Sequence, residues 1–101
     1  MPYLIVTSIP PENAGLRQDL RPAHLAYLDE KVAVILAAGA KLEDDGTPAA
    51  GSFYLVDYEH RDDARRFIDG DPYVSGGAVS QIEMTRVRKG YFNGARAEAP
   101  K

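Results

Sequence analysis

The stretch LRPAHLAYLDE, residues 20–30, contains an arginine and a histidine three residues apart, Arg21 and His24. Residues at this spacing share one face of a helix. Histidine titrates near neutral pH, so His24 is a candidate general acid or base. The planar fork of Arg21 suits a carboxylate or a phenolate. The alternative is a structural or solvent-facing histidine beside an exposed cation, and the spacing alone does not decide between the two.

The segment GDPY, residues 70–73, supplies a carboxylate with two possible roles. An aspartate before a proline is a good N-cap, and Pro72 then takes the first helical position. The carboxylate of Asp71 could instead, or in addition, orient the imidazole of His24 and balance its charge. The sequence does not show whether the two side chains meet, so both roles remain open.

Two hydroxyl groups are further candidates for binding a substrate, those of Ser52 and Tyr73. No G-x-S-x-G motif surrounds Ser52, so the serine-hydrolase class lacks its signature. No phosphate-binding glycine motif occurs either, which leaves nucleotide binding without support. The carboxylate clusters at residues 43–45 and 61–63 fit a solvated turn and a negatively charged helix start.

The composition is that of one ordinary globular domain, with 101 residues, 45% of them apolar and 27% charged. A formal net charge of -3 gives no electrostatic case for nucleic acid or an anionic membrane. The absence of cysteine excludes disulfides and thiolate catalysis. Two histidines far apart in the chain argue against a histidine-rich metal site. We therefore expect a site that uses no metal and no cofactor.

The chain shows no pattern typical of secretion or membrane insertion. Its longest apolar run, residues 32–40, is much shorter than the roughly 18 residues of a membrane span. The start, MPYLIVTSIP, has neither a basic region nor a small-residue cleavage site. These features predict a cytoplasmic protein.

Hydrophobic patterning predicts four strands, over residues 3–9, 34–40, 52–58 and 79–88. It also predicts helices over residues 22–31, with a start as early as residue 16, and 61–70, and a helical turn within 71–77. The run 32–36 fits either a helix end or a strand start. A hairpin loop is expected over residues 41–51, with its turn at 45–46.

Three local features refine these helices. Pro22 suits the first position of its helix, where the missing N–H costs nothing. A stripe of Leu25, Leu28 and Val32 is expected to face the sheet, with His24 at its border. Gly70 is expected to end the second helix as a left-handed C-cap.

The resulting order, βαββαβ, predicts an α+β, ferredoxin-like fold. Right-handed crossovers place both helices on one face of an antiparallel four-stranded sheet. The other face is too apolar to remain wet, so we expect a homodimer that packs through it. Whether such dimers form a higher homo-oligomer is left open.

Four segments together resemble the YciI-like, or YCII-related, family: RPAHLAYL (21–28), AAGA (37–40), GSFYLVDY (51–58) and DPYVSGG (71–77). The resemblance runs from about residue 4 to residue 89. It implies a dimeric α+β barrel in which residues 1–92 form one YciI-like domain. Residues 93–101 are polar and rich in Ala and Gly, and we expect them to form a loose tail. The resemblance further implies that His24 and Asp71 form the catalytic pair, and that the substrate-binding residues are Arg21, Ser52 and Tyr73.

Two segments depart from the family pattern. Ala38-Gly39-Ala40 stands where Ala-Gly-Pro is frequent, which could loosen the loop after the second strand. Residues 87–90 replace a Pro-aromatic pair at the end of the last strand, at the cleft wall and the dimer edge. Neither departure touches His24 or Asp71.

Two hypotheses about function follow. The first is a cofactor-free lyase or isomerase, of the dehydrochlorinase or lactone-isomerase type, that acts on a small cyclic or aromatic substrate by His24/Asp71 acid–base catalysis. The second is a non-catalytic module that binds a small molecule, or assembles, through the same cleft. An oxygenase of similar fold has less support, because it would need tryptophan and the chain has none.

Overall fold

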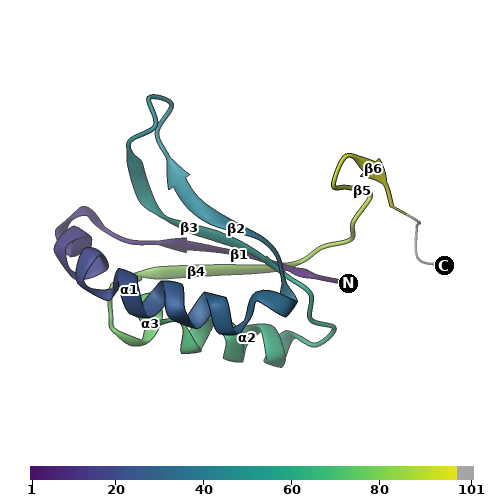
Figure 1. Ribbon diagram of the computed structural model, residues 1–101, viewed down its shortest axis with the longest axis horizontal. Coiled ribbons are helices and arrows are strands. Elements are labelled where there is room, and N and C mark those ends of the chain that lie inside the picture. Colours follow the sequence, from purple (N-terminus) through teal and green to yellow (C-terminus); the bar gives the residue numbers. More distant parts are fainter. Residues whose placement is uncertain (98–101) are drawn as a thin grey trace.

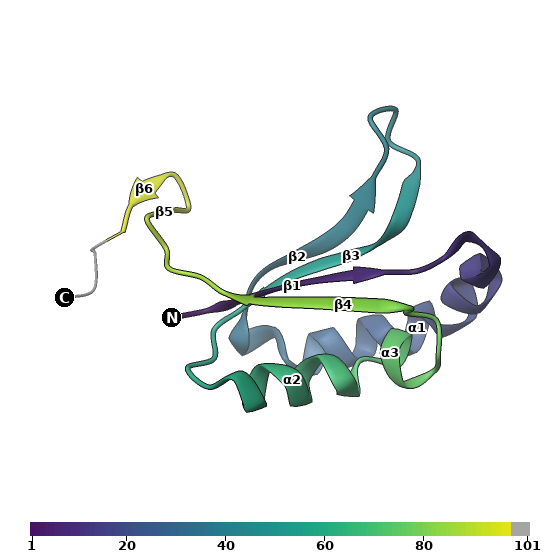
Figure 2. The same ribbon diagram turned by 180° about the vertical axis from the view of Figure 1, so that it is seen from behind.

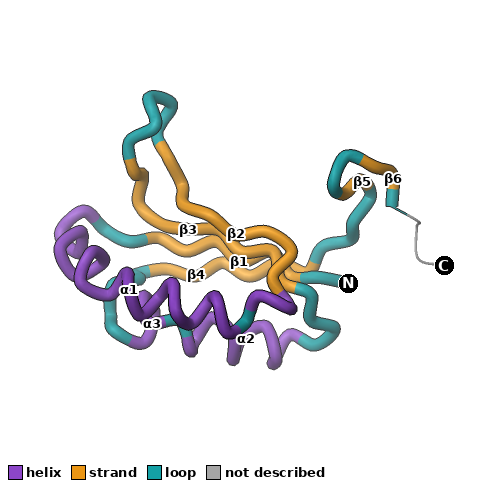
Figure 3. The backbone as a smooth tube through the Cα atoms, viewed as in Figure 1, coloured by secondary structure: helices purple, strands orange, loops and turns teal. Residues whose placement is uncertain are grey.

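The computed structural model describes residues 1–97, and it has two layers, a twisted sheet and a layer of helices (Figure 1). The sheet is antiparallel in the order β2-β3-β1-β4, with strands β1 (Tyr3–Ser8), β2 (Ile35–Leu42), β3 (Pro48–Val56) and β4 (Gln81–Arg86). The helices α1 (Ala14–Glu30), α2 (Arg61–Gly70) and α3 (Pro72–Ser75) all lie on one face, as the tube in Figure 3 shows. The predicted ferredoxin-like α+β fold is confirmed.

The core forms where alternate residues of the central strands meet the helices. Tyr3 and Ile5 of β1 are buried and lie opposite Val56 and Tyr54 of β3. Phe67 is one of three buried residues of α2 that pack against this set. The inward residues of β3 therefore alternate along the strand, as the period of two requires.

Helix α1 begins earlier than predicted, and Pro22 lies inside it instead of at its start. Proline has no N–H, so the helix lacks the hydrogen bond from residue 22 to the carbonyl of residue 18. Tertiary contacts offset this loss, because Leu20, just before the proline, packs with the buried Ile9 and Tyr73.

The buried stripe of α1 also differs from the prediction. Leu25 is 40% exposed and Val32 is 67% exposed, whereas His24 is only 7% exposed. Tyr27 and Leu28 pack against the core beside His24. The buried face of the helix is therefore formed by His24, Tyr27 and Leu28, and not by Leu25 and Val32. His24 and Tyr27 each combine an apolar ring with a polar atom, so a pattern of aliphatic residues alone does not identify them.

The β2–β3 hairpin is longer than predicted and projects beyond the rest of the sheet (Figure 2). Its turn includes Asp45 and Gly46, as expected, but both strands extend into the predicted loop. The ambiguous run before it forms a 3-10 helix, η2 (Val32–Val34), and β2 begins at the next residue. A short 3-10 helix, η1 (Pro11–Asn13), also precedes α1.

Gly70 is the last residue of α2 and does not adopt the left-handed conformation predicted for it. A Cβ atom at this position would lie 2.7 Å from the hydroxyl oxygen of Tyr27. That hydroxyl donates a hydrogen bond to the carbonyl of Phe67 at 2.7 Å. The glycine is therefore needed for the close approach of α1 to α2.

The last strand of the sheet is shorter than the predicted 79–88, and a small hairpin follows it, β5 (Tyr91–Phe92) and β6 (Ala95–Arg96). This hairpin stands away from the sheet (Figure 1). Of the predicted loose tail, residues 98–101 lie outside the described residues, so the division into domain and tail stays a prediction. Within residues 1–97, no helix is long and apolar enough to cross a membrane.

Candidate active site

The predicted carboxylate and histidine are in direct contact. Nδ1 of His24 lies 2.7 Å from Oδ1 of Asp71, and the carboxylate has no contact with solvent. The same Oδ1 accepts the backbone N–H of Tyr73 at 3.0 Å and thereby caps α3. The two roles that the sequence left open for Asp71 are therefore both present, on one oxygen atom.

The second carboxylate oxygen is occupied as well. The hydroxyl of Tyr54 donates a hydrogen bond to Oδ2 of Asp71 at 2.7 Å. Three donors thus surround the buried carboxylate, which is the environment that a buried negative charge requires. Asp71 has no free face toward a ligand and acts on the site only through its neighbours.

The imidazole of His24 is held in one orientation by its neighbours. The ring of Tyr73 stacks on it with centroids 3.8 Å apart and an interplanar angle of 12°. Because Asp71 accepts at Nδ1, the neutral ring carries its proton there and Nε2 is left with a free lone pair. In the part of the chain that is described, the one buried side-chain polar atom without a partner is Nε of Arg17, so Nε2 of His24 is not sealed off from solvent.

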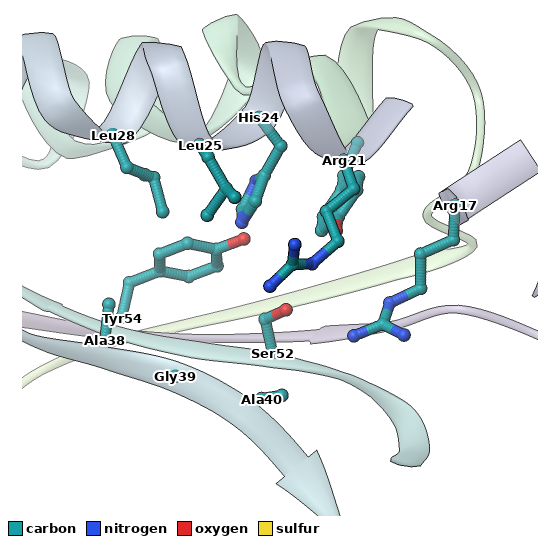
Figure 4. Close-up of a pocket in the computed structure, with 11 residues that line it drawn as sticks. Arg17, Arg21, His24, Leu25, Leu28, Ala38, Gly39, Ala40, Ser52 and Tyr54 are labelled. Atoms are coloured by element: carbon teal, nitrogen blue, oxygen red, sulfur yellow. The ribbon is translucent and has the colours of Figure 1, made fainter. Parts of the chain in front are cut away.

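A cavity of about 250 Å³ opens beside His24, between α1 and the β2–β3 side of the sheet (Figure 4). Helix α1 contributes Arg17, Arg21, His24, Leu25 and Leu28. The sheet and α3 contribute Ala38, Gly39, Ala40, Ser52, Tyr54 and Tyr73. One end of the cavity is therefore cationic, and the other is lined by leucines and small residues.

All five residues predicted for the site lie at this cavity or directly behind it. The side chains of Arg21 and Ser52 point into the same part of the cavity (Figure 4). The backbone N–H of Ser52 donates a hydrogen bond to Oγ1 of Thr7 at 3.1 Å, and this bond holds β3 against β1 at Ser52. Their roles toward a substrate remain predictions.

The segment Ala38-Gly39-Ala40 lies within β2 and not in a loop after it. The expectation that this departure from the family pattern loosens such a loop is therefore wrong. The three residues form the cavity wall opposite the leucines of α1. Their small side chains leave room for a ligand between the helix and the sheet.

Sequence reasoning missed two residues of the site, Arg17 and Tyr54. Arg17 is four residues before Arg21 and seven before His24, so the helical period places all three on one face once α1 is extended toward its true start. Tyr54 is two residues after Ser52 in β3, so the strand period places both on the inward face. These two spacings are the signals that could have found them.

The two tyrosines of the site stay protonated to higher pH than usual. Burial raises the pKa of Tyr54, and the negative charge of Asp71 raises it further. Burial also raises the pKa of Tyr73, while the guanidinium groups of Arg17 and Arg21 oppose that shift. Both phenols are therefore hydrogen-bond donors at neutral pH.

A metal would find no ready set of ligands in the residues that the structure describes, because no three histidine, aspartate or glutamate side chains gather there. The polar groups of the cavity are a base, two guanidinium groups and hydroxyls. Such a set can move a proton and stabilise an oxyanion.

Comparison with known proteins agrees with this architecture. Protein YciI from Escherichia coli O6:H1 and Protein YciI from Shigella flexneri are each 27% identical over 96 residues, covering 88% of this chain and 98% of theirs. Among solved structures, the chain is similar to 5-chloro-2-hydroxyhydroquinone dehydrochlorinase (TftG) from Burkholderia phenoliruptrix, in complex with 2,5-dihydroxybenzoquinone. The TM-score is 0.79 and the identity 29%, over 87% of this chain and 94% of that one. The model of the YCII-related domain matches residues 1–88, and the chain therefore belongs to the YCII-related domain family.

Proposed function

We propose that this protein is a cofactor-free lyase or isomerase that acts on a small cyclic or aromatic substrate by general acid–base catalysis. The observation that carries the proposal is the 2.7 Å hydrogen bond between His24 and Asp71 in the wall of a cavity. The carboxylate of Asp71 holds the imidazole of His24 in one orientation, and the guanidinium group of Arg21 lies at the same cavity. This arrangement is suited to removing a proton from a substrate while an oxyanion develops beside it.

In this mechanism Nε2 of His24 removes a proton from the substrate ring or from a ring hydroxyl. The Asp71 carboxylate stabilises the imidazolium that forms, and Arg21 binds the enolate or phenolate oxygen. In a lyase, the electron pair then expels a leaving group such as chloride. In an isomerase, the imidazolium returns the proton to a different atom of the ring.

The solved relative supports a reaction of this class. That relative is a dehydrochlorinase of a chlorinated hydroxyhydroquinone, and its structure contains a dihydroxylated quinone. Elimination of hydrogen chloride from such a ring requires a base and a group that stabilises oxyanion charge, which are the groups present at this cavity.

The working form in this proposal is a cytoplasmic homodimer. On the sheet face without helices, Leu4 lies opposite Leu55 and Val6 lies opposite Phe53, which makes a contiguous apolar surface. An identical surface on a second copy would cover it with twofold symmetry.

The test is turnover of a panel of small hydroxylated rings, including 5-chloro-2-hydroxyhydroquinone with chloride release as the readout. His24→Asn is expected to lower turnover by roughly 10²- to 10⁴-fold, which is the range for loss of a positioned base. His60→Asn is the matched control, because His60 is exposed and its side chain makes no capping hydrogen bond.

Equal turnover by His24→Asn and the wild type would refute the acid–base proposal. Binding of 2,5-dihydroxybenzoquinone in the cavity, without turnover of any ring in the panel, would favour the second hypothesis, a module that only binds small molecules.

A further inference from the structure

Arg17 is a guanidinium group at the His24 cavity that the proposed mechanism does not use. Helix α1 places it one turn before Arg21 on the same face. Its side chain points toward the part of the cavity that Arg21 and Ser52 also face (Figure 4).

No carboxylate of the described part of the chain neutralises the pair Arg17 and Arg21. Within residues 1–97, neither Arg17 nor Arg21 forms an ion pair, whereas Arg65, Arg66 and Arg86 all lie within ion-pair distance of a carboxylate. Asp71 is near the cavity, but its oxygen atoms are taken by other donors.

The surroundings of Arg17 hold the side chain in place. Its guanidinium carbon lies 5.7 Å from the centroid of the Tyr73 ring, within the range of a cation–π contact. Its Nε is buried without a partner, which is destabilising unless another interaction offsets it. The group also borders a second cavity with Glu43, yet it makes no ion pair with that carboxylate. Arg17 therefore has a fixed position at the cationic end of the cavity, and no carboxylate of residues 1–97 neutralises its charge.

The distance between the cationic end and the base sets the size of a ligand. Seven residues along a helix span about 10 Å, so the backbone positions of Arg17 and His24 are roughly that far apart. Arg21 and Ser52 lie between the two in the cavity, whereas Leu25 and the segment Ala38 to Ala40 line its apolar part, which suits a flat ring (Figure 4). A monocyclic compound with an anionic substituent on the side away from the reacting atom would fill this space.

We propose that the substrate carries a carboxylate and that Arg17 binds it, so that Arg17 selects ring acids over uncharged rings. Arg21 remains free to bind the oxyanion that develops on the ring. This inference rests on the proposed function for the role of His24, but it concerns binding and not turnover.

The experiment compares two ligands that differ by the carboxylate alone, 2,5-dihydroxybenzoate and hydroquinone, by calorimetric titration of the wild type and of Arg17→Gln. The wild type is expected to bind the acid at least about tenfold more tightly, which is the ratio expected from one charge-assisted hydrogen bond. Arg17→Gln should abolish this ratio and leave the affinity for hydroquinone unchanged. Added salt should reduce the ratio in the wild type.

Two further variants separate binding from folding. Arg17→Lys keeps the charge and should retain part of the preference, whereas Arg66→Gln, at an exposed residue that does not line the cavity, should retain all of it. Equal binding of both ligands by the wild type, no binding of the acid, or an equal loss of both ligands in Arg17→Gln would overturn the inference.

The outcome is independent of catalysis. A preference for the acid that depends on Arg17, without any turnover dependent on His24, would sustain the binding site and refute the proposed function. His24-dependent turnover of uncharged rings, without any preference for the acid, would sustain the proposed function and refute the carboxylate-binding role of Arg17.

Discussion

Tyr54 donates its phenolic proton to Oδ2 of Asp71 across 2.7 Å, and both residues are almost completely buried. This bond occupies the carboxylate oxygen that His24 leaves free. Asp71 is therefore a positioning residue, which fixes the imidazole and caps α3 but does not reach the cavity itself. The chemistry of the site is concentrated on His24 and the guanidinium groups beside it.

Removal of the Tyr54 hydroxyl should be costly for stability. In Tyr54→Phe the buried carboxylate loses one of its three donors, and the expected loss is about 1.5–3 kcal/mol of unfolding free energy. Urea denaturation measures it. Tyr58→Phe is the matched control, because Tyr58 packs against the same core but its hydroxyl makes no hydrogen bond in the described chain. Equal losses in the two variants would contradict the importance of the Tyr54–Asp71 bond.

The same tyrosine makes stability sensitive to alkaline pH. Burial, and then the charge of Asp71, raise the pKa of Tyr54 above the usual 10.0. Above that value the unfolded chain releases this proton while the folded chain keeps it, so the folded state is disfavoured. Stability from this group is complete below about pH 10 and falls as the pH rises further. Urea midpoints measured across this range should fall less steeply for Tyr54→Phe; an unchanged slope would refute the assignment.

Gly51 is predicted to be indispensable to the strand that presents Ser52. Its φ is 144°, and a Cβ atom there would lie 1.9 Å from the carbonyl oxygen of Thr7. Gly51→Ala should therefore cost more than about 3 kcal/mol, since it combines backbone strain with a clash. Gly46→Ala is the control: Gly46 also has a positive φ, of 88°, but nothing lies within 4 Å of its Cβ position. The two variants should differ clearly in urea midpoint, and similar midpoints would contradict the steric account.

The proposed dimer predicts that a charge on the open sheet face is disruptive. Phe53→Glu would place a carboxylate at the centre of the apolar surface, where burial against a second copy is unfavourable. Light scattering with size-exclusion chromatography should then give a monomer for this variant and a dimer for the wild type. Val32→Glu, at an exposed position outside that face, should remain dimeric. A monomeric wild type would refute the proposed assembly.

Much of the fold could be predicted from the sequence, because the strands have clear alternation and α2 has a compact apolar edge. The bounds of α2 were predicted correctly for this reason. The start of α1 was not, because Pro22 is a local signal for a helix start and only the packing of Leu20 shows that the helix continues through it.

The site was predictable in its residue types but not in its contacts. Sequence indicated that His24 and Asp71 matter, but they are 47 positions apart, and only the packing of α1 against α3 brings them together. The role of Tyr54 also depends on the packing of distant segments, because an inward tyrosine on a strand is interpreted from sequence as a core residue. Arg17 was missed because the helix was expected chiefly over residues 22–31, and the earlier start near residue 16 was not used to search for site residues.

The most direct test of the account is the position of the proton on the neutral imidazole of His24. Long-range nitrogen–proton correlation NMR of ¹⁵N-labelled protein, at a pH where the ring is neutral, distinguishes the two tautomers. The account predicts a proton on Nδ1, donated to Asp71, and an unprotonated Nε2 facing the cavity. A proton on Nε2 would contradict it, because His24 would then present a donor instead of a base to the substrate.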